Sequence, residues 1–162
     1  MKTSEIKEIV NAPLDKTWNV LFTQYGDIHV HNPNMIASEY MNNATEGEVN
    51  CVRSCKFDDK LYLEEKITEV HDKSMIRLEM TKSNLPFIKE IQAEYEVVRL
   101  DGNKTEIKMT SHISTSPGFM VYLMSGPMKK ALSKHLFGMK YYIETGKTVS
   151  KENYSKVYNS YS

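Results

Sequence analysis

Arg53 and Glu65 are the residues whose type and spacing best suit chemistry, because both alternate with apolar side chains along their segments. If Asp58-Asp59-Lys60 forms a three-residue hairpin loop, Phe57 pairs with Leu61, and the same register pairs Arg53 with Glu65. Side chains directly opposed on one face of a sheet have Cβ atoms about 4.5–5.5 Å apart. We therefore expect the two charges to meet on a mostly apolar face.

Two interpretations of this pair remain open. In the first, it is a structural ion pair, since a buried charge is costly unless a partner compensates it. In the second, it is a polar anchor in an apolar pocket. Arg53 would then hold a carboxylate, phenolate or carbonyl group of a ligand, and Glu65 would orient that group or a water.

His135 is the third residue that could take part in acid–base chemistry. It lies within an apolar stripe at helical spacing, so its imidazole can face a cavity, where it could exchange protons near neutral pH. A histidine whose ring simply packs at the edge of the helix is the alternative. The catalytic candidates from the sequence are thus Arg53, Glu65 and His135.

Metal binding has weak support in the sequence. His29 and His31 form a His-x-His pair, but no further cluster of ligands accompanies it. Cys51 and Cys55 lie four residues apart in one expected strand, which puts their Cα atoms roughly 13 Å apart, beyond the reach of a disulfide. We expect no metal, and we interpret the cysteines as small buried residues, which suits a reducing cytoplasm.

The elements that must position these residues follow from hydrophobic periodicity. A first strand over 3–11 precedes a helix that begins at Pro13 and ends before Gly26, and a single helical turn follows it. Segments in which apolar and polar residues alternate then indicate antiparallel strands with one face exposed to solvent. They are 35–40, 49–57 (with Val49 inward), 61–70, 75–81, 91–97 and 105–113.

The C-terminal third has a helical period instead. Met128, Leu132, His135 and Met139 recur every three to four residues, so an amphipathic helix is expected, with its end at Gly146. Gly126-Pro127 either starts this helix or kinks a longer one that begins near Phe119. A one-sided sheet needs a cover, and this helix is the only element large enough to supply it. The fold class is therefore α+β.

Composition excludes several classes of function. The 162 residues suit one domain, and 21 basic residues balance 21 acidic ones, so no overall field attracts nucleic acid or an anionic membrane. The N-terminus lacks the apolar stretch of a secretory signal, and no run of 18 apolar residues occurs. We expect a cytoplasmic protein without membrane insertion, and no cofactor-binding motif stands out.

Five segments resemble the START-like helix-grip superfamily, and within it the polyketide cyclase/dehydrase-type (SRPBCC) proteins. They are NAPLDKTWNVL, YGDIHVHNPNM, GEVNCVRSCKF, LEEKITEV and GMKYYIETG. The resemblance spans residues 3–147 and implies a curved sheet of about seven strands wrapped around the long C-terminal helix, with two short helices after the first strand. It also implies an internal cavity for lipids, polyketides or aromatic compounds.

The prediction is a helix-grip ligand-binding domain over 1–147, followed by a polar tail over 148–162. The tail is expected to be a loosely attached helix or an extended segment. The protein would bind a small hydrophobic or aromatic molecule as a carrier or sensor. It could instead be a cofactor-independent cyclase or dehydratase, or an interaction protein with a filled pocket. The expected ligand-binding residues are Arg53, Glu65, Cys51, Leu63, Ile67, Leu78, Tyr95, Met109, Met128, Leu132, His135 and Met139.

Overall fold

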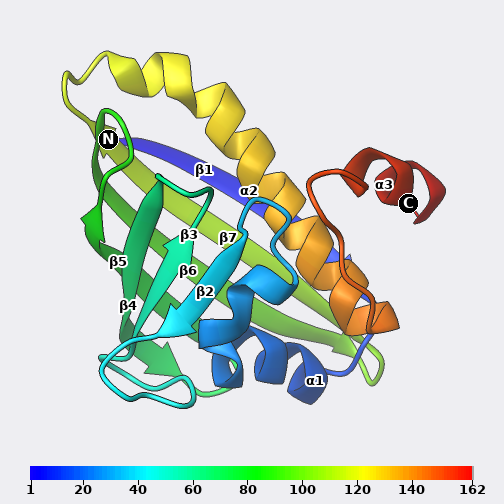
Figure 1. Cartoon of the computed structure of the whole chain (residues 1–162). Coiled ribbons are helices and arrows are strands. Elements are labelled where there is room, and N and C mark those ends of the chain that lie inside the picture. Colours follow the sequence, from blue (N-terminus) through cyan, green and yellow to red (C-terminus); the bar gives the residue numbers. More distant parts are fainter. Residues whose placement is uncertain (162) are drawn as a thin grey trace.

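A curved seven-stranded sheet grips one long helix in the computed structural model, which describes residues 1–161 (Figure 1). All neighbouring strands are antiparallel, and their order is β1-β7-β6-β5-β4-β3-β2. The predicted helix-grip architecture is confirmed. The strands are β1 (Lys2–Val10), β2 (Ala37–Tyr40), β3 (Val52–Lys56), β4 (Tyr62–His71), β5 (Met75–Ser83), β6 (Ile88–Asp101) and β7 (Lys104–Thr115). The helices are α1 (Leu14–Trp18), η1 (Asn19–Thr23), η2 (Tyr25–Val30), α2 (Met120–Thr145) and α3 (Tyr154–Tyr161).

The strands bury alternate residues, as the period-two pattern predicts. In β4, Leu63, Glu65 and Ile67 point to the concave face, and in β7 the residues from Thr105 to Ile113 alternate in the same way. The predicted pairings of Phe57 with Leu61 and of Arg53 with Glu65 are confirmed. The hairpin loop therefore sets the register that brings the two charges together.

One end of the strand at 49–57 differs from the prediction. β3 begins only at Val52, and Val49 is 47% exposed, so the prediction that Val49 faces inward is wrong. The preceding turn is held by a hydrogen bond from the Cys51 amide to the Glu48 carbonyl, which ends the alternation there. Cys51 and Cys55 are both buried free thiols, and burial raises the pKa of Cys55 to about 12.

The segment predicted as one helix from Pro13 to before Gly26 is two short helices, α1 and η1, and η2 lies where a single helical turn was predicted. α1 gives way to the π-helix η1, in which the Gln24 amide bonds the Asn19 carbonyl five residues back, and the 3-10 helix η2 follows. Together they bury Trp18, Leu21 and Tyr25 against one end of the concave face. This end of the molecule is consequently filled by side chains.

α2 crosses the concave face diagonally (Figure 1). It contains Pro127 within its first half, so the longer of the two predicted helices is the one that forms. Gly146 ends it with a left-handed backbone (φ 74°), as predicted from the sequence. None of the helices in residues 1–161 combines the length and apolar character that a membrane span requires.

The tail after α2 folds back on that helix. α3 places Tyr158 edge-on against Phe137, with ring centroids 5.0 Å apart. The Tyr161 hydroxyl donates a hydrogen bond of 2.7 Å to the Glu144 carboxylate. Val149, in the connection between the two helices, is buried. The tail thus takes the helical one of its two predicted conformations and packs against α2 through aromatic side chains.

Candidate functional site

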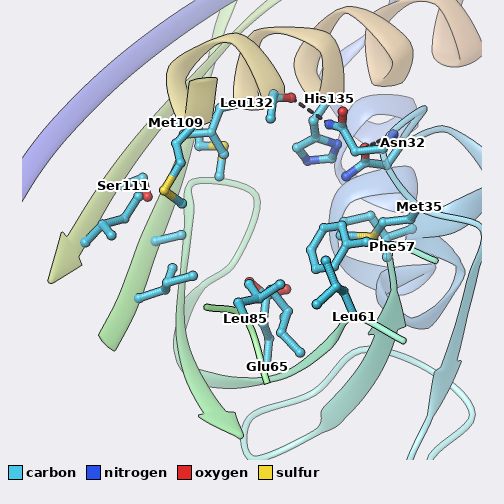
Figure 2. A pocket seen from close by; sticks show the side chains of 18 of the residues that line it. Asn32, Met35, Phe57, Leu61, Glu65, Leu85, Met109, Ser111, Leu132 and His135 are labelled. Atoms are coloured by element: carbon cyan, nitrogen blue, oxygen red, sulfur yellow. Dashed lines mark hydrogen bonds between the residues drawn. The ribbon is translucent and has the colours of Figure 1, made fainter. Parts of the chain in front are cut away.

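A cavity of about 400 Å³ lies between the concave face of the sheet and the middle of α2, from Met128 to His135 (Figure 2). The chain segment after η2 and the β3–β4 hairpin form its other walls. Most of the lining is apolar, which is typical of sites for small molecules. The apolar lining residues are Ile28, Met35, Phe57, Leu61, Leu63, Leu85, Ile91, Ala93, Met109, Ile113, Met128, Ala131 and Leu132.

The ion pair of Arg53 and Glu65 is part of the cavity wall. Arg53 Nε and Nη2 both donate to the same carboxylate oxygen, Glu65 Oε2, at 3.0 and 2.7 Å. The Arg53 side chain is only 5% exposed and the Glu65 side chain 12%. Because both charges are withdrawn from water, each depends on the other for compensation.

Tyr25 completes this ion pair from the opposite side. Arg53 Nη1 donates to the Tyr25 carbonyl at 3.0 Å, and the guanidinium lies 4.0 Å from the centre of the Tyr25 ring. The Tyr25 hydroxyl in turn donates to the Glu65 carbonyl at 3.0 Å. Burial alone would lower the pKa of Arg53, but Tyr25 and Glu65 outweigh it and raise that pKa above its usual value. Arg53 is therefore held as a cation.

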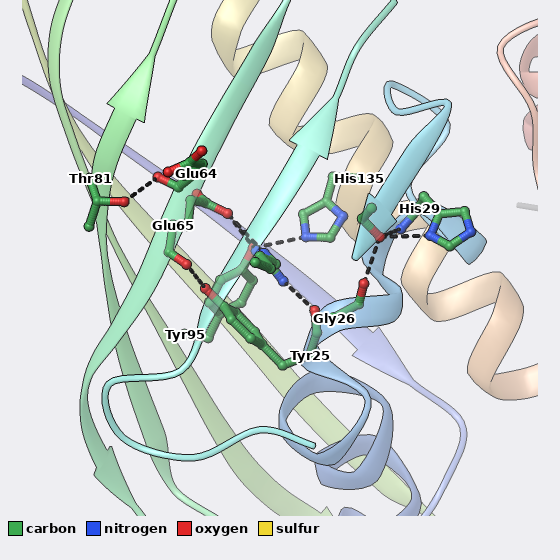
Figure 3. A network of polar contacts seen from close by, with 10 residues as sticks. Tyr25, Gly26, His29, Glu64, Glu65, Thr81, Tyr95 and His135 are labelled. Atoms are coloured by element: carbon green, nitrogen blue, oxygen red, sulfur yellow. Dashed lines mark hydrogen bonds and ion pairs between the residues drawn. The ribbon is translucent and has the colours of Figure 1, made fainter. Parts of the chain in front are cut away.

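A second polar contact joins β6 to α2. Tyr95 and His135 are both buried, and the Tyr95 hydroxyl lies 2.8 Å from His135 Nε2 (Figure 3). Burial raises the pKa of Tyr95, and burial, together with His31 and Arg53, lowers the pKa of His135 well below its usual value. We therefore assign the hydroxyl as donor and Nε2 as acceptor, which leaves the imidazole neutral with its proton on Nδ1.

His31 packs behind His135, with ring centroids 5.9 Å apart, and also stacks on Tyr142. Burial lowers the pKa of His31 to about 3, so this ring is neutral as well. Gly138 of α2 permits the approach, because a Cβ there would lie 2.1 Å from the His31 carbonyl oxygen. The Nδ1 atoms of His31 and His135 have no hydrogen-bond partner within residues 1–161.

His29 and His31 have separate surroundings in the structure. His29 Nδ1 bonds the Ser38 hydroxyl at 2.7 Å, whereas His31 is buried against α2. No group of three or more His, Cys, Asp or Glu side chains in the described part of the chain is arranged to hold a metal ion. The His-x-His spacing therefore does not bring the two rings to one ligand site.

The structure brings eight of the twelve predicted ligand-binding residues to the cavity and places four elsewhere. Those at the cavity are Arg53, Leu63, Glu65, Tyr95, Met109, Met128, Leu132 and His135. Those outside it are Cys51, Ile67, Leu78 and Met139, which belong to the packed core. The side chains of α1, η1 and η2 cover that part of the concave face, so its inward residues meet protein instead of open space.

Tyr25 and Asn32 are the residues that the sequence analysis missed. Tyr25 continues the spacing of Trp18 and Leu21, which is a signal that it belongs to the buried stripe. Asn32 lines the cavity and accepts a hydrogen bond from the Asn34 amide. It lies between two helical turns and a strand, where no periodicity indicates the direction of a side chain.

The fold recurs in solved structures, although no protein-family model and no curated protein sequence matches this chain. A START superfamily protein from Mycobacterium smegmatis superimposes with a TM-score of 0.65 at 14% identity, over 84% of this chain and 94% of the other. Norcoclaurine synthase from Thalictrum flavum, in complex with dopamine and hydroxybenzaldehyde, gives 0.65 at 15%, over 91% and 89%. DynU16, from the dynemicin biosynthetic locus, gives 0.68 at 15%, over 91% and 49%. The chain has the START-like helix-grip fold.

Proposed function

We propose that this protein binds a small hydrophobic or aromatic molecule in the cavity between the sheet and α2. The observation that carries the proposal is an apolar cavity of about 400 Å³ with one polar cluster in its wall. A pocket of this volume and composition suits a small organic ligand, whose orientation is set by a few polar groups. The volume argues against the alternative of a pocket filled by its own side chains.

The solved structures support the same class of ligand. Norcoclaurine synthase holds dopamine and hydroxybenzaldehyde, which are small aromatic compounds, and DynU16 comes from a biosynthetic locus. We assign ligand binding to the domain over 1–147. Lys151, from the tail over 148–162, also lines the cavity.

The two buried free thiols fit a reducing compartment, so we place the protein in the cytoplasm.

A second candidate function is that of a cofactor-independent cyclase or dehydratase. The observation that favours it is the hydrogen bond between Tyr95 and His135 at the cavity wall. The Tyr95 oxygen could take a proton from a bound substrate while the Tyr95 proton passes to His135 Nε2, so that the pair acts together as the base. Arg53 and Glu65 would then orient the substrate.

The binding proposal can be tested by filling the cavity. Ala93 of β6 points into it, while its neighbour Gln92 lies on the outer face of the same strand. We expect calorimetry to detect binding of naphthalene derivatives to the wild type and to Gln92→Phe. Binding to Ala93→Phe should fall at least tenfold, because the new ring occupies the ligand's space. Equal affinities of the two variants would contradict a site in this cavity.

Carrier and enzyme differ in what happens to the bound molecule. Native mass spectrometry of protein purified from its own host should reveal a co-purifying ligand, which names the chemical class. If the protein is an enzyme, that ligand or its precursor should be converted by the wild type and not by His135→Phe, while His112→Phe on the outer face stays active. Recovery of unchanged ligand from the wild type would favour the carrier.

A further inference from the structure

The charges at the cavity wall balance each other, and we propose that this cavity selects a neutral ligand that donates a hydrogen bond to Glu65. A phenol or an alcohol fits this description, and a carboxylate does not. This inference rests on the proposed binding function and adds the chemical class of the ligand's polar end.

The cationic half of the ion pair has little capacity left for an anionic ligand. Arg53 directs Nε and Nη2 to Glu65, directs Nη1 to the Tyr25 carbonyl, and rests its face on the Tyr25 ring. Its side chain is 5% exposed. These contacts use three of the five N–H donors of Arg53, and the others are buried with the side chain, so a carboxylate would have to displace a neighbouring group to reach them.

The acidic half, by contrast, retains an open acceptor. Both hydrogen bonds from Arg53 end on Glu65 Oε2, and the Tyr25 hydroxyl uses the Glu65 main-chain oxygen. No residue within 1–161 donates to Oε1, and Glu65 lines the cavity (Figure 2). An ionised carboxylate oxygen accepts strong hydrogen bonds, so a donor that enters this cavity finds its partner at Oε1.

The other titratable groups around the cavity add no net charge. His135 faces it as a neutral ring, because burial lowers its pKa, and the Tyr95 hydroxyl is bonded to that ring. At the rim, the acidic Asp58 is opposed by the basic Lys151. A ligand carboxylate would thus lose its hydration without gaining an unpaired cation, which is costly in an apolar site.

Three probes that share one naphthalene ring separate the possible polar ends: 2-naphthol, 2-methoxynaphthalene and 2-naphthoate. We expect calorimetry at neutral pH to show that 2-naphthol binds the wild type about tenfold more tightly than 2-methoxynaphthalene, which can only accept a hydrogen bond. We expect 2-naphthoate to bind most weakly. The comparison needs no variant, so it does not depend on whether a substituted ion pair still folds.

The variant Glu65→Gln sharpens the assignment to one atom. Its amide can still accept from Arg53 through oxygen, and it then presents an N–H₂ group to the cavity in place of Oε1. The preference for 2-naphthol over 2-methoxynaphthalene should disappear. Glu69→Gln is the matched control, since Glu69 lies on the same strand and pairs with Arg77 at the surface. The control should keep the preference of the wild type.

Each outcome decides between the inference and the function on which it rests. Equal affinity of the wild type for 2-naphthol and 2-methoxynaphthalene, or tightest binding of 2-naphthoate, would overturn the inference and leave the binding function standing. A wild type that binds none of the three probes would contradict the binding function, and the inference with it.

Discussion

The concave face of the sheet has a packed half and a hollow half. Over the packed half, Trp18 and Tyr25 from the short helices close on Ile67 and Ile76 without a sizeable void. Over the hollow half, the middle of α2 spans the sheet and leaves the cavity beneath it. The strands alternate in the same way in both halves. What covers a face therefore decides whether its residues form core or line a pocket.

Arg53 and Glu65 lie at the border of the two halves. Tyr25 reaches them from the packed side, and the cavity opens on the other side. The Arg53–Glu65 ion pair thus lies between the packed core and the cavity, and it places polar atoms at one end of the cavity.

The largest expected effect is on this border. Arg53→Met should lower the free energy of unfolding by about 3–5 kcal/mol, because it leaves the Glu65 carboxylate buried without its cation. Urea denaturation at neutral pH measures the loss. The control is Arg77→Met on the outer face, where the ion pairs with Glu69 and Glu94 are open to solvent, so the loss of stability should be much smaller. If Arg53→Met and Arg77→Met lower the free energy of unfolding equally, the Arg53–Glu65 ion pair is not buried in solution.

Truncation of side chains compares the halves directly. Ile67 is fully buried in the packed half, so Ile67→Ala should cost about 2–5 kcal/mol through lost burial and a new void. Leu132 is half-buried at the cavity wall, and Leu132→Ala should cost roughly 1 kcal/mol because the truncation only enlarges an existing space. Urea denaturation checks both values. A larger cost for Leu132 would mean that the hollow half is packed in solution.

Histidine burial gives the packed boundary a pH dependence. The pKa of His31 is lowered to about 3 in the folded protein, whereas the unfolded chain takes up the proton near the usual pKa of about 6.5. Stability should therefore be retained above pH 6.5 and lost as the pH falls, by at most about 1.4 kcal/mol per pH unit for this group.

Measurements of unfolding free energy at pH 7 and pH 5 test this dependence. His31→Phe should lose about 1–2 kcal/mol less than the wild type between the two values, because one of the two buried imidazoles is gone while His135 remains. His112→Phe, on the outer face of β7, should keep the dependence of the wild type. Parallel pH profiles for the wild type and His31→Phe would refute the assignment of a buried neutral imidazole.

The smallest effect on stability is expected at the cavity rim. Met35→Leu conserves volume, so it should change the free energy of unfolding by less than about 1.5 kcal/mol. The stiffer side chain should nevertheless narrow the range of ligand shapes that the cavity accepts. Thermal unfolding and a series of naphthalenes with different substituents measure the two effects. If Met35→Leu binds the same range of ligands as the wild type, Met35 does not help the cavity to accept ligands of different shape.

Much of the sheet and its polar pair could be predicted from the sequence. The three-residue loop after Phe57 fixes the β3–β4 register. That register brings Arg53 and Glu65 together, so a contact between two strands could be predicted from a local turn. The helical stripe likewise placed Leu132 and His135 toward the sheet.

The division into packed and hollow halves could not be predicted in the same way. Ile67 and Leu63 have identical patterns in β4, yet only Leu63 lines the cavity. The difference depends on η1 and η2, whose π and 3-10 geometry no hydrophobic period indicates. Tyr25 and His31 lie in or next to these segments, which is why their contacts with Arg53 and His135 were missed.

Gly138 has a mechanical consequence for this division. Since no side chain separates α2 from the His31 carbonyl, helix and loop meet backbone to backbone. Such a contact has no rotamers through which it could yield, so the spacing of α2 from the packed half is stiff. Adjustment to a ligand is therefore left to side chains that line the cavity, such as Met128 and Leu132, which can change rotamer without moving the helix.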